Sequence, residues 1–275
     1  MRATIATSQA TPEEPNEDFA AAGANGAVLL DGAGLAGTGT RCVHGVAWYA
    51  RHLGGAVLAG LPDEDLDLTS ILARAIAETA ALHADTCDLD DPGTPSATVV
   101  AVRACRDRLE YLVLADSVLV LDTKVGPPVV VTDDRGNRIG RRFRQEMDRT
   151  RHGTPEHAEA RRRYVEALRA YRNRPGGFWV AAADPAAAAQ AITGHRLLRE
   201  VDRAVLLSDG AHRIVAPFGL ATWRAVLDTL DTHGPAEIIR QVRRAESSDP
   251  DGSRWPRAKT HDDATVVYCT DLVNR

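Results

Sequence analysis

Three strand-like runs follow one another directly in the middle of the chain, and they constrain the fold more than any other feature. They are "SATVVAVRAC" (96–105), "LEYLVLADSVLVLDT" (109–123) and "PVVVT" (128–132), each rich in β-branched residues and bounded by turn residues. A tight turn at 106–108 joins the first two. Strands that succeed one another without helices between them pair antiparallel, so a regular alternation of strands and helices is excluded.

Helical periodicity appears on both sides of these runs. Helices are predicted at 40–59, 67–85, 155–171, 185–193, 221–230 and 235–246, and further strands at 3–10, 26–34, 178–184, 203–210 and 264–272. No internal repeat or Gly/Pro/Ser-rich linker divides the chain, so residues 1–275 are expected to form a single domain. The order of elements predicts an α+β layered fold.

Composition excludes several classes of function. The net charge of −5 gives no electrostatic basis for binding nucleic acid or a membrane. No apolar run approaches the roughly 18–20 residues that cross a bilayer, and the first ten residues lack the apolar core of a signal peptide. We expect a cytoplasmic monomer with no nucleic-acid or membrane partner. The four cysteines form no CxxC and no histidine has zinc spacing, so buried, reduced thiols are expected.

Acidic residues recur where predicted strands end. Asp31 follows "VLL" and precedes Gly32, and Asp209 follows "AVLLS" and precedes Gly210. Either pair alone could be a turn signal. Asp116 instead interrupts an apolar run, where an unpaired carboxylate is costly to desolvate. Converging carboxylates repel one another unless a cation joins them, and oxygen ligands favour Mg²⁺ or Mn²⁺ over Zn²⁺.

The ordered set "NEDF", "VLLDGAG", "PSATVVAV", "YLVLADSVLVL", "VLLSDGAHR" and "DDATVV" resembles the metal-dependent protein phosphatase family, the protein phosphatase 2C type, in its bacterial branch. Each motif is weak alone, but all six occur in the family's order. The resemblance implies a central β-sandwich of two antiparallel sheets flanked by helices on both sides (α-β-β-α). It also implies a phosphate-monoester hydrolase in which a water bridging two Mn²⁺ or Mg²⁺ ions attacks phosphorus.

The resemblance further implies roles for individual residues. Asp31 would bridge the two ions, and the Gly32 carbonyl would ligate one of them. Asp209 and Asp262 would hold the first ion. The expected catalytic residues are therefore Asp31, Asp209 and Asp262.

The same resemblance implies further residues at the metal centre. Glu17 would act at the second ion, partly through water, and Asp18 would orient those waters. Asp116, with Asp209, would form a third and weaker site.

Three positions depart from the family pattern. The family commonly has an Arg that grips the substrate phosphate four residues before Glu17, but this chain has Glu13 there. Arg is hard to replace because its planar fork binds phosphate bidentately. Ala33 stands where some members have a His proposed as general acid, so water would protonate the leaving group. Asp263 replaces an Asn and adds a charge that could strengthen metal binding.

Two substitutes for the missing phosphate ligand are candidates. One is Arg41, just past the Gly-rich turn. The other is the segment from Arg135 to Arg174, which holds 13 Arg against five acidic residues and falls where the family carries a variable flap. This segment is either a solvated helical face with ordinary i,i+4 ion pairs or a lid that recognises an anionic substrate.

Three functions stay open from the sequence. The first is a phosphoserine/phosphothreonine protein phosphatase, and the second is a phosphatase of a small phosphorylated metabolite. The third is a non-catalytic binding module with a phosphatase fold. The presence of Asp31, Asp209 and Asp262 favours the two enzymes.

Overall fold

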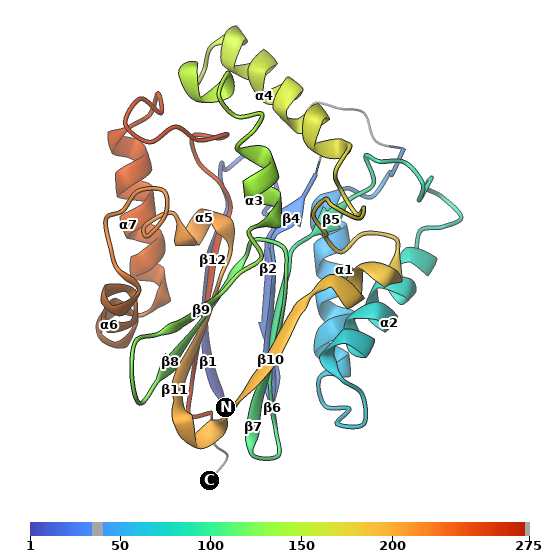
Figure 1. The fold of residues 1–275 in the computed structure, drawn as a ribbon, viewed down its shortest axis with the longest axis vertical. Helices are drawn as coiled ribbons and strands as arrows, with labels where there is room; N and C mark the ends of the chain where they lie inside the picture. Colours follow the sequence, from blue (N-terminus) through green and yellow to red (C-terminus); the bar gives the residue numbers. More distant parts are fainter. Residues whose placement is uncertain (35–40, 273–275) are drawn as a thin grey trace.

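Two five-stranded antiparallel sheets pack face to face in the computed structural model, which describes residues 1–34 and 41–272 (Figure 1). One sheet has the order β1 (Arg2–Ser8), β12 (Ala264–Thr270), β11 (Val201–Leu207), β8 (Val118–Thr123) and β9 (Val129–Val131). The other has the order β10 (Ile192–Leu197), β7 (Arg108–Leu114), β6 (Val99–Cys105), β3 (Gly26–Leu30) and β2 (Phe19–Ala22).

Helices cover the outer face of each sheet (Figure 1). The helices α1 (Val46–Gly60) and α2 (Leu68–Ala81) pack on the sheet that contains β3 and β6. The helices α6 (Trp223–His233) and α7 (Pro235–Ser248) pack on the sheet that contains β11 and β12. This arrangement confirms the α-β-β-α layering that the resemblance implied.

Alternate residues of the central strands face two different apolar layers. In β3, Val28 and Leu30 face α1 and α2, whereas Leu29 faces the space between the sheets. In β11, Val205 packs under α6 and α7 and Leu206 points to the middle layer. Strands buried on both faces read as continuous apolar runs, which is why both stretches lack polar alternation.

The run at 109–123 is two strands rather than one. It breaks at Ala115, whose φ is +69°, and β7 and β8 on either side of the break belong to different sheets. Asp116 therefore lies in the crossover between the sheets and not inside an apolar strand. The sequence prediction was wrong here because apolar residues continue through the break.

Other boundaries also differ from expectation. The stretch 178–184 forms two isolated bridges, from Phe178 to Arg172 and from Ala181 to Ala97, in place of a strand. The helix predicted at 185–193 is a 3₁₀ helix, η2 (Pro185–Gln190), followed by β10. β10 is an edge strand with no buried residue, so it lacks the apolar pattern that would reveal it. The helix predicted at 40–59 begins at Val46, and residue 40 lies outside the described residues.

The remaining elements gather near one end of the sandwich. They are β4 (Gly32–Ala33) paired with β5 (Ser96–Ala97), α3 (Arg135–Gly140), η1 (Met147–Arg149), α4 (Pro155–Arg169) and α5 (Asp209–His212). η3 (Leu198–Glu200) lies between β10 and β11. In Figure 1, α3 and α4 lie above the upper ends of the sheets.

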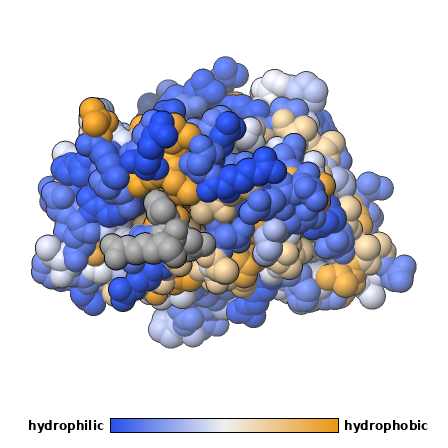
Figure 2. Space-filling view, turned by 90° about the horizontal axis from the view of Figure 1, so that it is seen from below, coloured by the Kyte–Doolittle hydropathy of each residue, from blue (hydrophilic) through white to orange (hydrophobic). Residues whose placement is uncertain are grey.

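The opposite end of the molecule is seen in Figure 2. Hydrophilic side chains dominate it, with hydrophobic residues in smaller groups between them, as on most globular proteins. Among the described residues, no helix combines the length and the apolar character needed to cross a membrane.

Candidate metal centre

Carboxylates from five separate parts of the chain meet between the upper ends of the two sheets. Asp31 comes directly after β3, and Asp116 lies between β7 and β8. Asp209 begins α5 after β11, Asp262 precedes β12, and Glu17 and Asp18 precede β2. The Asp209 amide donates a hydrogen bond to Asp31 Oδ2 over 3.1 Å, which joins the two Asp-Gly turns across the sandwich.

The glycines of both Asp-Gly pairs are required by close packing. A Cβ on Gly32 would lie 2.5 Å from the Glu17 carbonyl oxygen and 2.5 Å from Val46. A Cβ on Gly210 would lie 2.0 Å from the Asp263 carbonyl oxygen. Neither distance is possible for a real side chain, so each glycine lets a ligand-bearing turn approach its neighbour. These contacts also place Gly32 beside Glu17, and Gly210 beside the turn that carries Asp262.

The cluster carries more negative charge than the surrounding protein balances. Burial raises the pKa of Asp31 well above its usual range, and the nearby carboxylates of Asp209, Asp18, Asp262 and Asp116 raise it further. Burial and Asp209 together raise the pKa of Asp116 to about 7, although the Asn137 amide lowers it. These directions have a common cause, because carboxylates in a poorly solvated site favour the protonated form.

Asp18 is the most isolated of these groups. Its side chain is buried, and neither carboxylate oxygen has a hydrogen-bond partner of normal geometry among the described residues. Burial raises its pKa to about 8, although the nearby hydroxyls of Thr265 and Ser208 lower it. Burial likewise raises the pKa of Glu17, which Lys259 lowers. Unpartnered buried oxygens together with oxygen-only donors fit a hard divalent cation such as Mn²⁺ or Mg²⁺.

Asp262 is the one predicted ligand with strong cationic partners. The Lys259 ammonium donates to its Oδ1 over 2.7 Å, and Arg213 donates to its Oδ2 over 2.9 Å. Burial lowers the pKa of Lys259, but Asp262, Asp209 and Asp31 raise it, with a net increase. The sequence analysis missed Lys259 because it lies in a loop with no pattern, although it is one of only two lysines in the chain.

Arg213 belongs to a buried ion-pair network that holds the turn before β12. Glu246 of α7 is fully buried and accepts hydrogen bonds from Arg213 (2.7 Å) and Arg243 (2.8 Å). His261 Nδ1 lies 2.8 Å from Glu246 Oε2, the oxygen that also accepts from Arg243. Arg243 also donates to the Asp262 backbone carbonyl over 2.6 Å. The network therefore fixes the backbone of Asp262, and His261 faces Glu246.

Asp263 ties down the N-terminal segment. Its two carboxylate oxygens accept hydrogen bonds from the backbone amides of Ala10 and Glu17, both over 2.7 Å. An Asn would offer only one such oxygen. The charge that the sequence analysis assigned to metal binding is thus used to position Glu17.

Hydroxyl groups link the two sheets beneath the carboxylates. The Asp31 amide donates to Thr98 Oγ1 over 3.2 Å, and that hydroxyl lies 2.6 Å from Ser117 Oγ, next to Asp116. Both hydroxyls are buried. They fix the spacing between Asp31 and Asp116, and the small-Ser/Thr-Thr strand motif at 96–98 was the signal that marked one of them.

Arg41 lies against other acidic groups. Its guanidinium pairs with Asp88 over 2.6 Å, and its backbone amide donates to Asp91 over 2.7 Å. Its side chain is largely exposed, with 77% of its surface accessible. The structure thus gives Arg41 a partner in the loop after α2 and leaves its predicted role in substrate binding without support.

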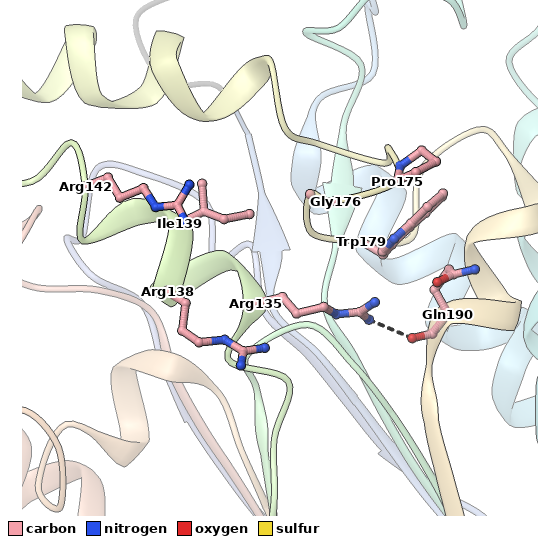
Figure 3. Close-up of a pocket in the computed structure, with 9 residues that line it drawn as sticks. Arg135, Arg138, Ile139, Arg142, Pro175, Gly176, Trp179 and Gln190 are labelled. Atoms are coloured by element: carbon pink, nitrogen blue, oxygen red, sulfur yellow. Dashed lines mark hydrogen bonds between the residues drawn. The ribbon is translucent and has the colours of Figure 1, made fainter.

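The segment from Arg135 to Arg174 borders the carboxylate cluster at α3. Asn137 of α3 donates to Asp116 Oδ2 over 3.3 Å. α3 also lines a pocket of about 530 Å³, opposite the loop that carries Trp179 (Figure 3). Arg138 and Arg142 line this pocket, together with Arg135, which is held by Asp133 and by the Gln190 carbonyl.

Comparison with known proteins adds an independent result. A family model described as "Protein phosphatase 2C" matches residues 6–242. A search of curated proteins gives no match.

Solved structures with the same fold come from bacterial phosphatases. The catalytic domain of the serine/threonine protein phosphatase PstP, in complex with two manganese ions, is 21% identical over 97% of this chain and 96% of its own, with a TM-score of 0.56. PstP/Ppp of Mycobacterium tuberculosis is 20% identical over 97% of each chain, also with a TM-score of 0.56. Stp1 of Staphylococcus aureus is 14% identical over 99% and 95%, with a TM-score of 0.53. At these identities the likeness establishes the fold.

Proposed function

The chain belongs to the protein phosphatase 2C family, and from this premise we propose that it dephosphorylates phosphoserine and phosphothreonine in proteins with the help of Mn²⁺ or Mg²⁺. The observation that carries the proposal is the buried carboxylate cluster. Asp31 is surrounded by four further acidic side chains, and both oxygens of Asp18 lack a partner among the described residues. A divalent cation relieves this repulsion and supplies the missing partner.

The residues that would hold the ions are those of the cluster. Asp31, Asp209 and Asp262 would bind a first ion, with Asp31 shared by a second. The other donors are the Gly32 carbonyl, Glu17 and Asp18, the last two acting through water, and Asp116 at a third site. Bound Mn²⁺ or Mg²⁺ would supply a water activated as nucleophile at neutral pH, and positive charge for the phosphoryl oxygens.

Lys259 is the side chain best placed to replace the phosphate-binding Arg that Glu13 does not provide. Its ammonium contacts Asp262 over 2.7 Å and is close enough to Asp31 and Asp209 for both to raise its pKa. The Lys259 ammonium therefore lies beside the carboxylates that would bind the metal ions. With a metal ion bound by Asp262, the Lys259 ammonium would be available to bind a phosphate oxygen as a point charge.

The two lysines of the chain provide a matched test of this role. Lys259→Ala is expected to lower kcat/KM about ten- to a hundredfold, the loss of one charge-assisted hydrogen bond, and Lys259→Arg should restore part of it. Lys124→Ala is the control, because Lys124 lies 3.9 Å from Asp202 and both side chains are half exposed. Equal kcat/KM for both alanine variants would contradict the role of Lys259.

The central test is metal-dependent hydrolysis. Wild-type protein should hydrolyse p-nitrophenyl phosphate with added Mn²⁺ and lose the activity with a chelator. Asp31→Ala and Asp209→Ala should abolish it, whereas Asp202→Ala, in an exposed ion pair on β11, should not. A folded wild-type protein without turnover in Mn²⁺ or Mg²⁺ would point to the third possibility, a binding module.

A phosphatase of a small metabolite is the second candidate, and the pocket beside α3 favours it. A volume of about 530 Å³ falls in the range of small-ligand sites. Arg138 and Arg142 would bind an anionic group there, and Trp179 offers an aromatic wall (Figure 3). Turnover of phosphopeptides should be compared with turnover of a panel of sugar and nucleoside phosphates. The better substrate class by kcat/KM decides between the two candidates.

The role of the Arg-rich segment can be tested on either substrate class. Arg142→Ala should raise KM for the true substrate and leave p-nitrophenyl phosphate nearly unchanged. Arg163→Ala is the control, because Arg163 lies on α4 and pairs with Glu146 and Glu159. Similar effects of Arg142→Ala on both substrates would argue against a recognition lid.

A further inference from the structure

Four side chains that are separated in the sequence converge beside the outer helices. Cys42 and His44 lie just before α1, and His83 and Cys87 lie just after α2. One ligand atom from each can be chosen so that all four lie within 4.8 Å of one another. The expectation of reduced, mostly buried thiols agrees with the structure, in which all four cysteines are thiols and three are buried. Cys42 and Cys87 are 45 positions apart, so the sequence showed no pair, and the packing of α1 on α2 brings them together.

The distances between these atoms match a tetrahedral site. Cys42 Sγ lies 3.4 Å from Cys87 Sγ and 3.7 Å from His83 Nδ1, and His44 Nδ1 lies 3.3 Å from Cys87 Sγ. Bonds of about 2.3 Å from Zn²⁺ to sulfur and about 2.0–2.1 Å to nitrogen place tetrahedral ligands about 3.3–3.8 Å apart. Three of the six edges of the tetrahedron therefore already have the required length.

We propose that Cys42, His44, His83 and Cys87 bind one structural Zn²⁺, at a site separate from the carboxylate centre. Two thiolates and two imidazoles are a soft donor set that favours Zn²⁺ over Mg²⁺, Mn²⁺ and Ca²⁺. The four protein ligands would fill the coordination shell, which is the pattern of structural and not catalytic zinc.

Local structure orients each half of the site. The Cys87 amide donates to the His83 carbonyl over 2.9 Å, so one helical turn places the two side chains on the same face. Trp48, on the first turn of α1, lies against both imidazoles, with ring centroids 4.3 Å from His44 and 5.1 Å from His83. The aromatic ring provides an apolar wall that limits access of water to the site.

Burial also suits a metal site at this place. His83 is 1% exposed and Cys42 is 6% exposed, so an imidazole and a thiol lie side by side in a poorly solvated position, with His83 Nδ1 3.7 Å from the Cys42 sulfur.

The proposed zinc site would fasten the chain that leads away from the carboxylate centre. Cys42 follows Gly34 by eight positions, and Gly34 ends the turn that begins at Asp31. Arg41 already joins the same two segments. Its guanidinium pairs with Asp88 and its backbone amide donates to Asp91, both in the loop that follows Cys87. A bound Zn²⁺ would cross-link the start of α1 to the end of α2 and thereby close a loop of about 45 residues, which stabilises mainly by restricting the unfolded chain.

The main alternative use of the two thiols is a disulfide. The Sγ atoms are 3.4 Å apart, whereas a disulfide bond is about 2.05 Å long. A disulfide would also leave the two histidines without a function. The geometry of all four side chains together favours the metal.

The experiment measures zinc directly and does not depend on phosphatase activity. The full chain is purified without chelators and its metals are quantified by mass spectrometry. Wild type should contain about one Zn²⁺ per chain, and Asp31→Asn should retain it, because that substitution alters the other centre. Cys87→Ser and His44→Ala should each reduce zinc to less than about a tenth of an equivalent at micromolar free zinc. Cys105→Ser, in β6, is the matched control and should keep the full amount.

A second measurement covers the case in which the variants fold poorly. Wild type in which Zn²⁺ is exchanged for Co²⁺ should show the intense visible absorption of tetrahedral Co²⁺ with thiolate charge-transfer bands. Removing zinc from wild type should lower its thermal midpoint. A folded wild-type protein with no zinc, equal zinc in Cys87→Ser and Cys105→Ser, or a Cys42–Cys87 disulfide in the intact mass would each overturn the proposal.

Discussion

Replacing Asp18 by Asn should stabilise the metal-free protein, although it removes a predicted functional group. Asp18 is buried, both its oxygens lack a partner among the described residues, and its pKa is raised from 3.8 to about 8. Holding a proton at pH 7 on a group that loses it at 3.8 in the unfolded chain costs about 4 kcal/mol, at about 1.4 kcal/mol per pH unit. Asn has nearly the same shape and carries no charge, but its amide also needs partners, so the net gain should be about 2 kcal/mol.

The gain should depend on pH in a defined direction. The folded protein binds a proton at Asp18 more tightly than the unfolded chain, so the wild type loses stability as pH rises from about 4 to about 8. The difference between Asp18→Asn and wild type should therefore be near zero at pH 4 and largest at and above pH 8. Metal should reverse the order, because Mn²⁺ stabilises the protein whose ligands bind it better.

Thermal unfolding followed by circular dichroism, with a chelator and then with Mn²⁺, measures both effects. A gain of about 2 kcal/mol corresponds to a rise of about 4–8 °C in Tm for a chain of this size. Asp202→Asn, at an exposed position, should change Tm little under either condition. If metal-free Asp18→Asn is less stable than wild type at pH 8, the carboxylate is solvated or partnered and the explanation by desolvation fails.

Three further substitutions test the framework of the site. Gly210→Ala should lower the free energy of unfolding, measured by urea denaturation, by at least about 2 kcal/mol, because its Cβ would meet the Asp263 carbonyl. Gly55→Ala, on the open surface of α1, should not lower it. Equal effects of the two substitutions would refute the close approach at Gly210. Glu246→Gln should lose about 3 kcal/mol, since it removes the buried charge that Arg213 and Arg243 share. Half-exposed Glu78→Gln should be neutral. A neutral Glu246→Gln would mean that the network is not needed. Asp263→Asn should lower the free energy of unfolding by about 1 kcal/mol and speed hydrogen exchange at the Glu17 amide. Unchanged exchange at that amide would show that Asp263 does not position Glu17.

Particular elements show how far local sequence could predict the fold. The α2 helix was predicted because its apolar stripe is local. The structure shows a local cap as well, since the Asp67 side chain accepts from the Ser70 amide over 2.7 Å. The break at Ala115 was missed because the turn between the two sheets has no Gly or Pro, and apolar residues continue on both sides. β10 was missed because an exposed edge strand needs no apolar alternation. An apolar pattern in the sequence indicates which residues are buried. It cannot locate the boundary of an element where burial does not change across that boundary.

The residues of the candidate site also divide into those that the sequence could predict and those that it could not. The acidic residues could be found from sequence, because each lies beside or within a recognisable apolar run, and the described structure brings Asp31, Asp116, Asp209 and Asp262 close together. Lys259 and Arg213 could not be found in this way, since their importance comes from contacts with Asp262 and not from a motif. The use of Asp263 to hold the Ala10 and Glu17 amides was equally invisible.

The sequence by itself determined helices such as α2, α6 and α7 and the buried central strands, and which donor atoms the carboxylate centre offers, because these depend on residue type and short-range order. Only the tertiary structure decided which charges are balanced and which are not, because that depends on side chains hundreds of positions apart. The same is true of Cys42, His44, His83 and Cys87. Their individual spacings carry no metal signature, and the packing of α1 against α2 brings the two thiols and two imidazoles within 4.8 Å of one another.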